Sequence, residues 1–129
     1  ILMRLKSDLV ALCNAALDCK LDSIDTEWDP RPSLGVVMAA GGYPASYNKG
    51  DIINGLPADT SDSKVFHAGT AEKDGQIVTN GGRVLCAVAL GDTVAEAQKR
   101  AYQLIKQIRW NGAYYRRDIG YRAISRENA

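Results

Sequence analysis

Two tight-turn signals constrain the fold of this chain more than any other feature of the sequence. They are Asp74-Gly75 and Asn80-Gly81-Gly82, and they favour turns because Gly and Asn tolerate positive φ. Short apolar runs of strand length lie before and after them. We expect strands at residues 34–40, 65–68, 76–79 and 83–90, with the last one central and buried. Strands this short, with connections this tight, predict a compact antiparallel sheet.

A helix is predicted before the strands. Apolar residues recur every three or four positions from Leu5 to Leu17, so they share one face of a helix that ends near Lys20. Residues 21–33 are then polar and rich in Asp and Pro, which favours a connection and a domain boundary. The 129 residues suffice for one ordinary core but not for two large domains.

A second helix is predicted after the strands. Thr93 and Glu96 have the spacing of a capping box, in which each side chain binds the backbone of the other residue. An apolar stripe follows, and Gly112 can end the helix as a left-handed cap. The tail is aromatic and rich in Arg, with a strand-like piece at residues 121–124. The fold class is therefore α+β: a small, mostly antiparallel β domain with flanking helices.

The composition argues against several classes of function. Sixteen Lys and Arg residues against fifteen Asp and Glu residues give a net charge of +1, whereas nucleic-acid-binding proteins usually show a basic excess. No apolar run approaches the roughly 20 residues of a membrane-spanning helix, so neither nucleic acid nor membrane is an expected partner. The cysteines Cys13, Cys19 and Cys86 match no CxxC spacing and fit free thiols in a reducing cytoplasm. His67 alone cannot build a His-rich metal site.

Two local features could bind an anion. Gly41-Gly42 ends a predicted buried strand, and the N–H groups of such a turn can form a nest for phosphate; the alternative is a turn without a ligand. Arg4 and Lys6 lie near the start of the first helix, where basic residues oppose the helix dipole and could hold a phosphate or carboxylate. The alternative there is solvated surface, which is also the simplest interpretation of Arg116-Arg117.

The common catalytic motifs do not occur in the sequence: there is no GxGxxG, GxxxxGK[ST], GxSxG or HExxH. We therefore expect no self-contained catalytic centre and no catalytic residue within this chain. The tyrosines and tryptophans are expected to serve mostly in packing.

Five strings, in this order and spacing, carry a family resemblance: Arg4-Leu5-Lys6-Ser7-Asp8-Leu9, Gly35-Val36-Val37-Met38-Ala39-Ala40-Gly41-Gly42-Tyr43-Pro44, Phe66-His67-Ala68-Gly69-Thr70, Gly81-Gly82-Arg83-Val84-Leu85 and Arg117-Asp118-Ile119-Gly120. Together they resemble the final third of the glycinamide ribonucleotide synthetase family, over essentially all 129 residues. Each string alone is weak, but five in register over one domain are specific.

The resemblance implies the C-terminal part of an ATP-grasp ligase. Such a ligase uses ATP with Mg²⁺ or Mn²⁺ to activate glycine, and the amine of 5-phosphoribosylamine then attacks it. The products are glycinamide ribonucleotide, ADP and phosphate, in cytoplasmic purine biosynthesis. In the family the metal ligands lie just ahead of the string at Arg4. They and the nucleotide pocket are therefore expected upstream of Ile1, in a missing N-terminal part, and this piece alone is expected to be inactive.

The resemblance also implies a division of the chain. Residues 1–26 correspond to the last helix and linker of the ATP-grasp region. Residues 27–129 correspond to the C-terminal domain, which is biotin carboxylase C-domain-like, a rudiment hybrid barrel-sandwich. Arg4, Lys6, Gly41 and Gly42 are expected to bind substrate in the cleft. The alternative is a non-catalytic binding or scaffold domain of related fold, which would have no use for these residues on one concave surface.

Overall fold

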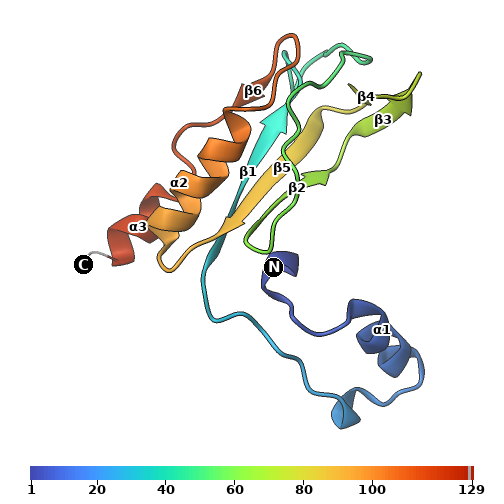
Figure 1. Cartoon of the computed structure of the whole chain (residues 1–129), viewed down its shortest axis with the longest axis vertical. Helices are drawn as coiled ribbons and strands as arrows, with labels where there is room; N and C mark the ends of the chain where they lie inside the picture. The colour runs from blue at the N-terminus through green and yellow to red at the C-terminus, as the bar shows by residue number, and fades with distance from the viewer. Residues whose placement is uncertain (128) are drawn as a thin grey trace.

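The computed structural model describes residues 1–127 and 129 (Figure 1). In chain order, its elements are η1 (Leu2–Arg4), α1 (Leu9–Leu17), η2 (Leu21–Ser23), β1 (Ser33–Ala39), β2 (Ser63–His67), β3 (Thr70–Lys73), β4 (Gln76–Thr79), β5 (Arg83–Leu90), α2 (Val94–Ile105), β6 (Tyr114–Tyr115) and α3 (Tyr121–Glu127). None of the helices in this part of the chain is long and apolar enough to cross a membrane.

The main sheet has the strand order β2-β5-β1-β6, and all of its pairings are antiparallel. β5 lies between β1 and β2, and its residues Val84, Leu85, Ala87 and Ala89 have no exposed surface. The predictions of antiparallel pairing and of a central, buried strand at residues 83–90 are therefore confirmed. The predicted strands at 34–40, 65–68 and 76–79 match β1, β2 and β4 to within two residues.

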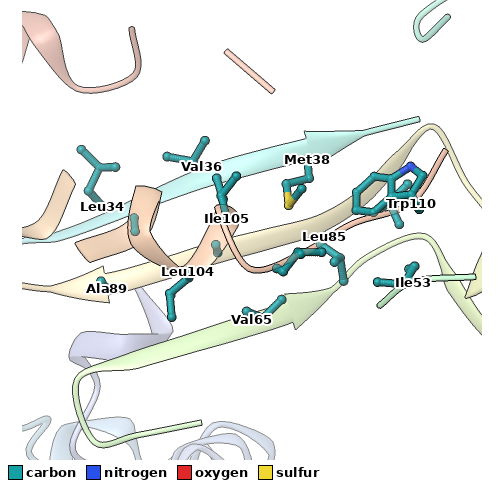
Figure 2. Packing of buried hydrophobic residues seen from close by; sticks show 14 of the residues in the cluster. Leu34, Val36, Met38, Ile53, Val65, Leu85, Ala89, Leu104, Ile105 and Trp110 are labelled. Carbon is teal, nitrogen blue, oxygen red and sulfur yellow. The ribbon is translucent and has the colours of Figure 1, made fainter. Parts of the chain in front are cut away.

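One face of the main sheet forms the hydrophobic core. α2 packs along β1 and β5 and covers this face (Figures 1 and 2). The larger side chains between the helix and the sheet are Leu34, Val36, Met38, Val65, Leu85, Leu104 and Ile105. Because side chains alternate along a strand, the residues between them on β1 face the other way. Gly35 and Val37 are accordingly exposed, on a face that no helix of the described chain covers.

β3 and β4 form a separate two-stranded sheet. Asp74 and Gly75 turn this hairpin with φ values of 51° and 73°, which confirms the first turn signal. The second signal has a different role. Asn80 donates its N–H to the carbonyl of Gly69 at 2.7 Å, and the segment connects β4 of one sheet to β5 of the other. The prediction of a single sheet was therefore wrong, and β3 was not expected.

α1 begins later than predicted. The carboxylate of Asp8 accepts hydrogen bonds from the N–H groups of Val10 and Ala11, at 2.7 and 3.2 Å, and so caps a helix that begins at Leu9. Leu5, expected in the helix, instead pairs with Trp28 in an antiparallel bridge. None of the α1 residues is buried, so its apolar side chains contact little of this chain.

The N-terminal cap of α2 is formed as predicted, with one difference. The hydroxyl of Thr93 accepts from the N–H of Glu96 at 3.1 Å. The carboxylate of Glu96 accepts from the N–H of Asp92, at 2.9 Å, rather than from that of Thr93. The helix ends at Ile105, well before Gly112. It ends early because the backbone of Arg109 exchanges two hydrogen bonds with Asn54, at 2.8 and 2.9 Å.

The tail differs from its prediction, because residues 121–124 belong to α3 and not to a strand. The carboxylate of Glu127 accepts from the N–H of Val94, at 2.8 and 3.0 Å, at the start of α2. The amide of Gln98 donates to the carbonyl of Ile119 at 2.6 Å. These contacts with α2 hold the tail in place. The strand of the tail is β6, which pairs with the end of β1.

Candidate functional site

Gly41 and Gly42 form a tight turn directly after β1. The N–H of Tyr43 donates to the carbonyl of Ala40 at 3.1 Å, and Gly42 has a φ of 93°, which favours glycine. A Cβ on Gly41 would lie 2.8 Å from the carbonyl oxygen of Gly112. Within the described residues, neither glycine N–H donates a backbone hydrogen bond. Both donors are therefore available to a ligand.

Arg4 and Lys6 lie on an N-terminal segment that pairs with residues 27–29. The N–H of Lys6 donates to the carbonyl of Glu27 at 2.9 Å, and the N–H of Asp29 donates to the carbonyl of Arg4 at 2.7 Å. The guanidinium of Arg4 donates through Nε to the Asp29 carbonyl at 3.0 Å. The ammonium of Lys6 lies 3.5 Å from the carboxylate of Glu27. Both side chains of that ion pair are exposed and the charges are screened by water, so Glu27 attracts the Lys6 ammonium only weakly.

The structure does not bring the two pairs together. Asp29 precedes β1 and Gly41 follows it, so the length of this strand separates the segment that holds Arg4 from the glycine turn. At about 3.3 Å per residue, a strand of this length spans roughly 20 Å. Figure 1 shows the N-terminus beside the lower end of the sheet, whereas β1 points to the upper end. The four residues thus form two separate points in this chain.

A pocket of about 230 Å³ opens on the uncovered face of the main sheet, beside the glycine turn. We call it the tyrosine pocket. Its floor consists of the outward-facing residues of β1, and its walls come from the glycine turn, from the start of β5 and from the tail. Its lining includes Val37, Ala39, Tyr43, Arg83, Tyr114 and Arg116. It is therefore mostly apolar and aromatic, with two guanidinium groups.

A β-bulge places Arg83 on this face. Met38 pairs with Leu85, but the next residue, Ala39, pairs with Arg83, so Val84 is an extra residue on β5. Val84 and Leu85 are consequently both buried in the core. Arg83 then shares the outer face with Ala39, and both line the tyrosine pocket. Bulges commonly re-aim side chains in this way, often beside active sites.

The other pocket residues are held by specific contacts. The ring of Tyr43 packs directly over Gly82, where any side chain would collide with it. Arg116 donates to both carboxylate oxygens of Asp118, at 2.9 and 2.6 Å. This hydrogen-bonded ion pair lowers the pKa of Asp118 and raises that of Arg116. Arg83, by contrast, has no ion-pair partner in the described part of the chain.

An ion-pair network joins the linker before β1 to the domain. Arg31 donates to the buried carboxylate of Asp29, with its closest contact at 2.8 Å, and to Asp62 at 3.0 Å. The side-chain hydrogen bond from Arg31, supported by its backbone N–H, holds the pKa of Asp29 well below its usual range. The guanidinium of Arg100 lies 3.8 Å from Asp62 and extends the network to α2. These charges satisfy one another, which favours a structural role.

The described residues offer no site for the metal that the resemblance implies. Among them, no group of three or more His, Cys, Asp or Glu side chains is placed to hold an ion. The ring of His67 lies 3.0 Å from the hydroxyl of Thr70 through Nδ1. Cys13, Cys19 and Cys86 are free thiols, and burial raises the pKa of Cys86.

Comparisons with known proteins match this fold and sequence to one family. The model of the family described as phosphoribosylglycinamide synthetase, C domain, matches residues 33–122. The chain belongs to this family. It is 66% identical over 128 residues to a phosphoribosylamine–glycine ligase of Vibrio vulnificus, and 65% identical over 130 residues to one of Vibrio cholerae. These alignments cover 98% and 100% of this chain, but only 30% of each relative.

A solved structure supports the same assignment. The crystal structure of phosphoribosylamine–glycine ligase from Thermotoga maritima matches with a TM-score of 0.69 and 41% identity. The match covers 84% of this chain and 27% of the chain in that crystal structure. The small α+β domain with antiparallel sheets is therefore the fold of the family's C domain, and the chain spans about a third of the length of its relatives.

Sequence reasoning missed most of the tyrosine pocket. It interpreted Arg116-Arg117 as solvated surface and the tyrosines as packing, and it gave Arg83 no role. One signal was present: Tyr43 and Arg83 each fall in a string that carries the family resemblance. Antiparallel pairing of the strands beside these strings brings the two residues to one edge of the sheet.

Proposed function

We propose that this chain is the C-terminal part of a phosphoribosylamine–glycine ligase. The complete protein would join glycine to 5-phosphoribosylamine with ATP, and release glycinamide ribonucleotide, ADP and phosphate in the cytoplasm. The observation that carries the proposal is 66% identity across 98% of this chain to a ligase of that name. Identity at this level over nearly the whole chain is more than a scaffold domain of related fold would need to retain.

The division of the chain is part of the proposal. Residues 1–26 would be the end of the ATP-grasp region, and residues 27–129 the C-terminal domain with a biotin carboxylase-like, rudiment hybrid barrel-sandwich fold. Two observations support the division. The family model starts at residue 33, and α1 has no buried residue. A helix that is apolar on most sides is normally buried, so the preceding part of the protein is the natural partner of α1.

The catalytic metal and the nucleotide would be held by that preceding part. ATP, with Mg²⁺ or Mn²⁺, would supply the activation of the glycine carboxyl group. The residues of this chain hold no metal cluster in its described part, so they would act by binding and orienting substrate and by excluding water from one side of the cleft. Gly41 and Gly42 would bind an anionic group through their available N–H groups, and Arg4 and Lys6 would do so separately, near the preceding part.

Activity measurements test the proposal directly. The complete protein that carries this chain should form glycinamide ribonucleotide and ADP from 5-phosphoribosylamine, glycine and ATP. The 129 residues alone should neither catalyse the reaction nor bind ATP tightly, because phosphoryl transfer needs a phosphate-binding loop and a metal site. Micromolar binding of ATP to this piece in a calorimeter would contradict this division of labour, and a complete protein without ligase activity would favour the scaffold alternative.

Mutation in the complete protein tests the anion-binding point formed by Arg4 and Lys6. Lys6→Ala or Arg4→Ala should lower kcat/KM for 5-phosphoribosylamine about tenfold or more, since a hydrogen bond to a charged group contributes about 1.5–3 kcal/mol. Lys99→Ala, on the exposed surface of α2, is the matched control and should leave kcat/KM unchanged. Wild-type kinetics in both variants would remove Arg4 and Lys6 from the site.

A further inference from the structure

The tyrosine pocket combines an apolar floor with a single uncompensated positive charge. Arg116 is neutralised by the two contacts with Asp118, whereas Arg83 is exposed and without an ion-pair partner in the described residues. A bulge in β5, and not the regular alternation of the strand, puts Arg83 on this face. An exposed guanidinium that lines a concave surface is suited to bind a carboxylate or a phosphate through two parallel N–H groups.

The size of the pocket limits what can occupy it. Its volume is about 230 Å³, which is below the roughly 300–1,000 Å³ of pockets for drug-sized ligands. A nucleotide such as ATP is larger than this space, whereas a phosphorylated pentose is small enough. Tyr43 and Tyr114 present rings with an apolar face and a hydroxyl, a combination that suits the mixed C–H and O–H surface of a sugar.

The glycine turn meets the pocket through Tyr43. Tyr43 lines the pocket and follows Gly42 directly, and the N–H groups of Gly41 and Gly42 donate no backbone hydrogen bond within the described chain. The backbone of this turn is fixed, since Gly41 packs on Gly112 and the Tyr43 ring packs on Gly82. A rigid turn and a free guanidinium therefore border the same hollow.

We propose that the tyrosine pocket binds the phosphorylated pentose of the amine substrate, with Arg83 on its phosphate and the rings of Tyr43 and Tyr114 against its sugar. This inference rests on the proposed function, because the ligase reaction supplies the phosphopentose. It assigns the phosphate of the pentose to Arg83, a residue that the sequence did not single out, and leaves Arg4 and Lys6, about a strand length away, to a different anionic group of the reaction. Arg83 is then a specificity-determining residue for the phosphorylated substrate.

Equilibrium binding to the complete protein tests the pocket without depending on activity. Ribose 5-phosphate serves as the probe in calorimetry, with ribose and inorganic phosphate as its two halves. Ribose 5-phosphate should bind more tightly than either half, and Arg83→Met should weaken its binding by about tenfold to a hundredfold, the range for loss of a charged hydrogen bond. Arg122→Met removes the same charge from α3, outside this pocket, and should leave binding unchanged.

A second variant blocks the pocket without removing a charge. Val37→Phe places a larger side chain on the exposed floor, at a strand position that accepts aromatic residues, and should weaken ribose 5-phosphate binding without lowering the melting temperature. In ligase assays, Arg83→Met should raise KM for 5-phosphoribosylamine and leave KM for ATP and glycine unchanged. Arg83→Lys should recover part of this loss.

The outcomes separate this inference from the proposed function. Binding of ribose 5-phosphate that depends on Arg83, in a protein without ligase activity, would support the pocket and refute the ligase. An active ligase in which Arg83→Met and Val37→Phe bind ribose 5-phosphate as the wild type does would overturn the pocket. If Arg83→Met and Val37→Phe lower the melting temperature of the complete protein but leave ribose 5-phosphate binding unchanged, the pocket would also be overturned, and a structural role for its lining would be favoured.

Discussion

Leu85→Ala gives the sharpest test of the core, because Leu85 lies on the central strand with no exposed surface. The substitution removes three carbon atoms, which at about 0.8 kcal/mol per buried CH₂ corresponds to about 2.4 kcal/mol of lost transfer free energy. β1, β2 and α2 surround the site, so it should collapse only partly. A residual cavity of roughly 50 Å³ adds about 1.2 kcal/mol at about 24 cal/mol per Å³. We expect the free energy of unfolding to fall by about 3.6 kcal/mol.

Urea unfolding followed by tryptophan fluorescence measures this change, since Trp110 is buried in the same core and should report its opening. Val37→Ala is the matched control: it shortens a side chain on the adjacent strand β1, but on the opposite face, where 43% of the residue is exposed. It should cost less than about 1 kcal/mol. A loss below about 1 kcal/mol for Leu85→Ala, or equal losses for the two variants, would refute the assignment of the buried face.

Three further predictions concern the ends and connections of the elements. Thr93→Ala should destabilise the chain by about 1 kcal/mol in thermal melts through loss of the α2 cap, and an unchanged melt would mean that the cap does not form in solution. Asp29→Asn should be less stable than wild type, because Arg31 depresses the pKa of Asp29 in the folded state. The difference should be complete above about pH 4, the pKa of an unfolded Asp, and should decrease as the pH falls further. Equal melting temperatures of the two proteins at pH 7 would exclude a stabilising role for the Asp29 carboxylate. Limited proteolysis should cut within residues 22–33 before it cuts within 84–90.

The regular strands of the main sheet could be predicted because their signal is local. β1 and β5 are apolar runs bounded by turn residues, and both are paired in the core. β3 and β6 carry no such signal. Thr70–Lys73 is mostly polar and becomes a strand only by pairing with β4, and the two residues of β6 become one only by pairing with β1. Pairing over long sequence distances therefore created the strands that were missed.

Whether a helix boundary could be predicted also depended on whether it is set by local or by distant contacts. The cap at Thr93 depends on residues three positions apart, and it was predicted. The early end of α2 depends on Asn54, which lies 55 positions from Arg109, so the apolar stripe and Gly112 could not reveal it. α3 was mistaken for a strand because Tyr121 and Ile124 favour strands. Glu127 instead satisfies the exposed N–H of Val94 at the start of α2 and ties the helical tail to it.

The candidate site lies where regular structure is interrupted, and this explains why the sequence revealed only half of it. The glycine pair was visible because glycine is itself the signal of a positive φ or a close approach, and both occur there.

Arg83 was invisible because its direction depends on one extra residue in β5. Without the bulge at Val84, strict alternation from the buried Leu85 would direct Val84 outward and Arg83 toward the core, where an unpaired guanidinium would be strongly destabilising. The bulge buries Val84 and places Arg83 beside Tyr43. The same irregularity therefore preserves the core and supplies the charge of the pocket. A change in β5 that removes the bulge should impair both the packing of the core and the binding of an anion in the pocket.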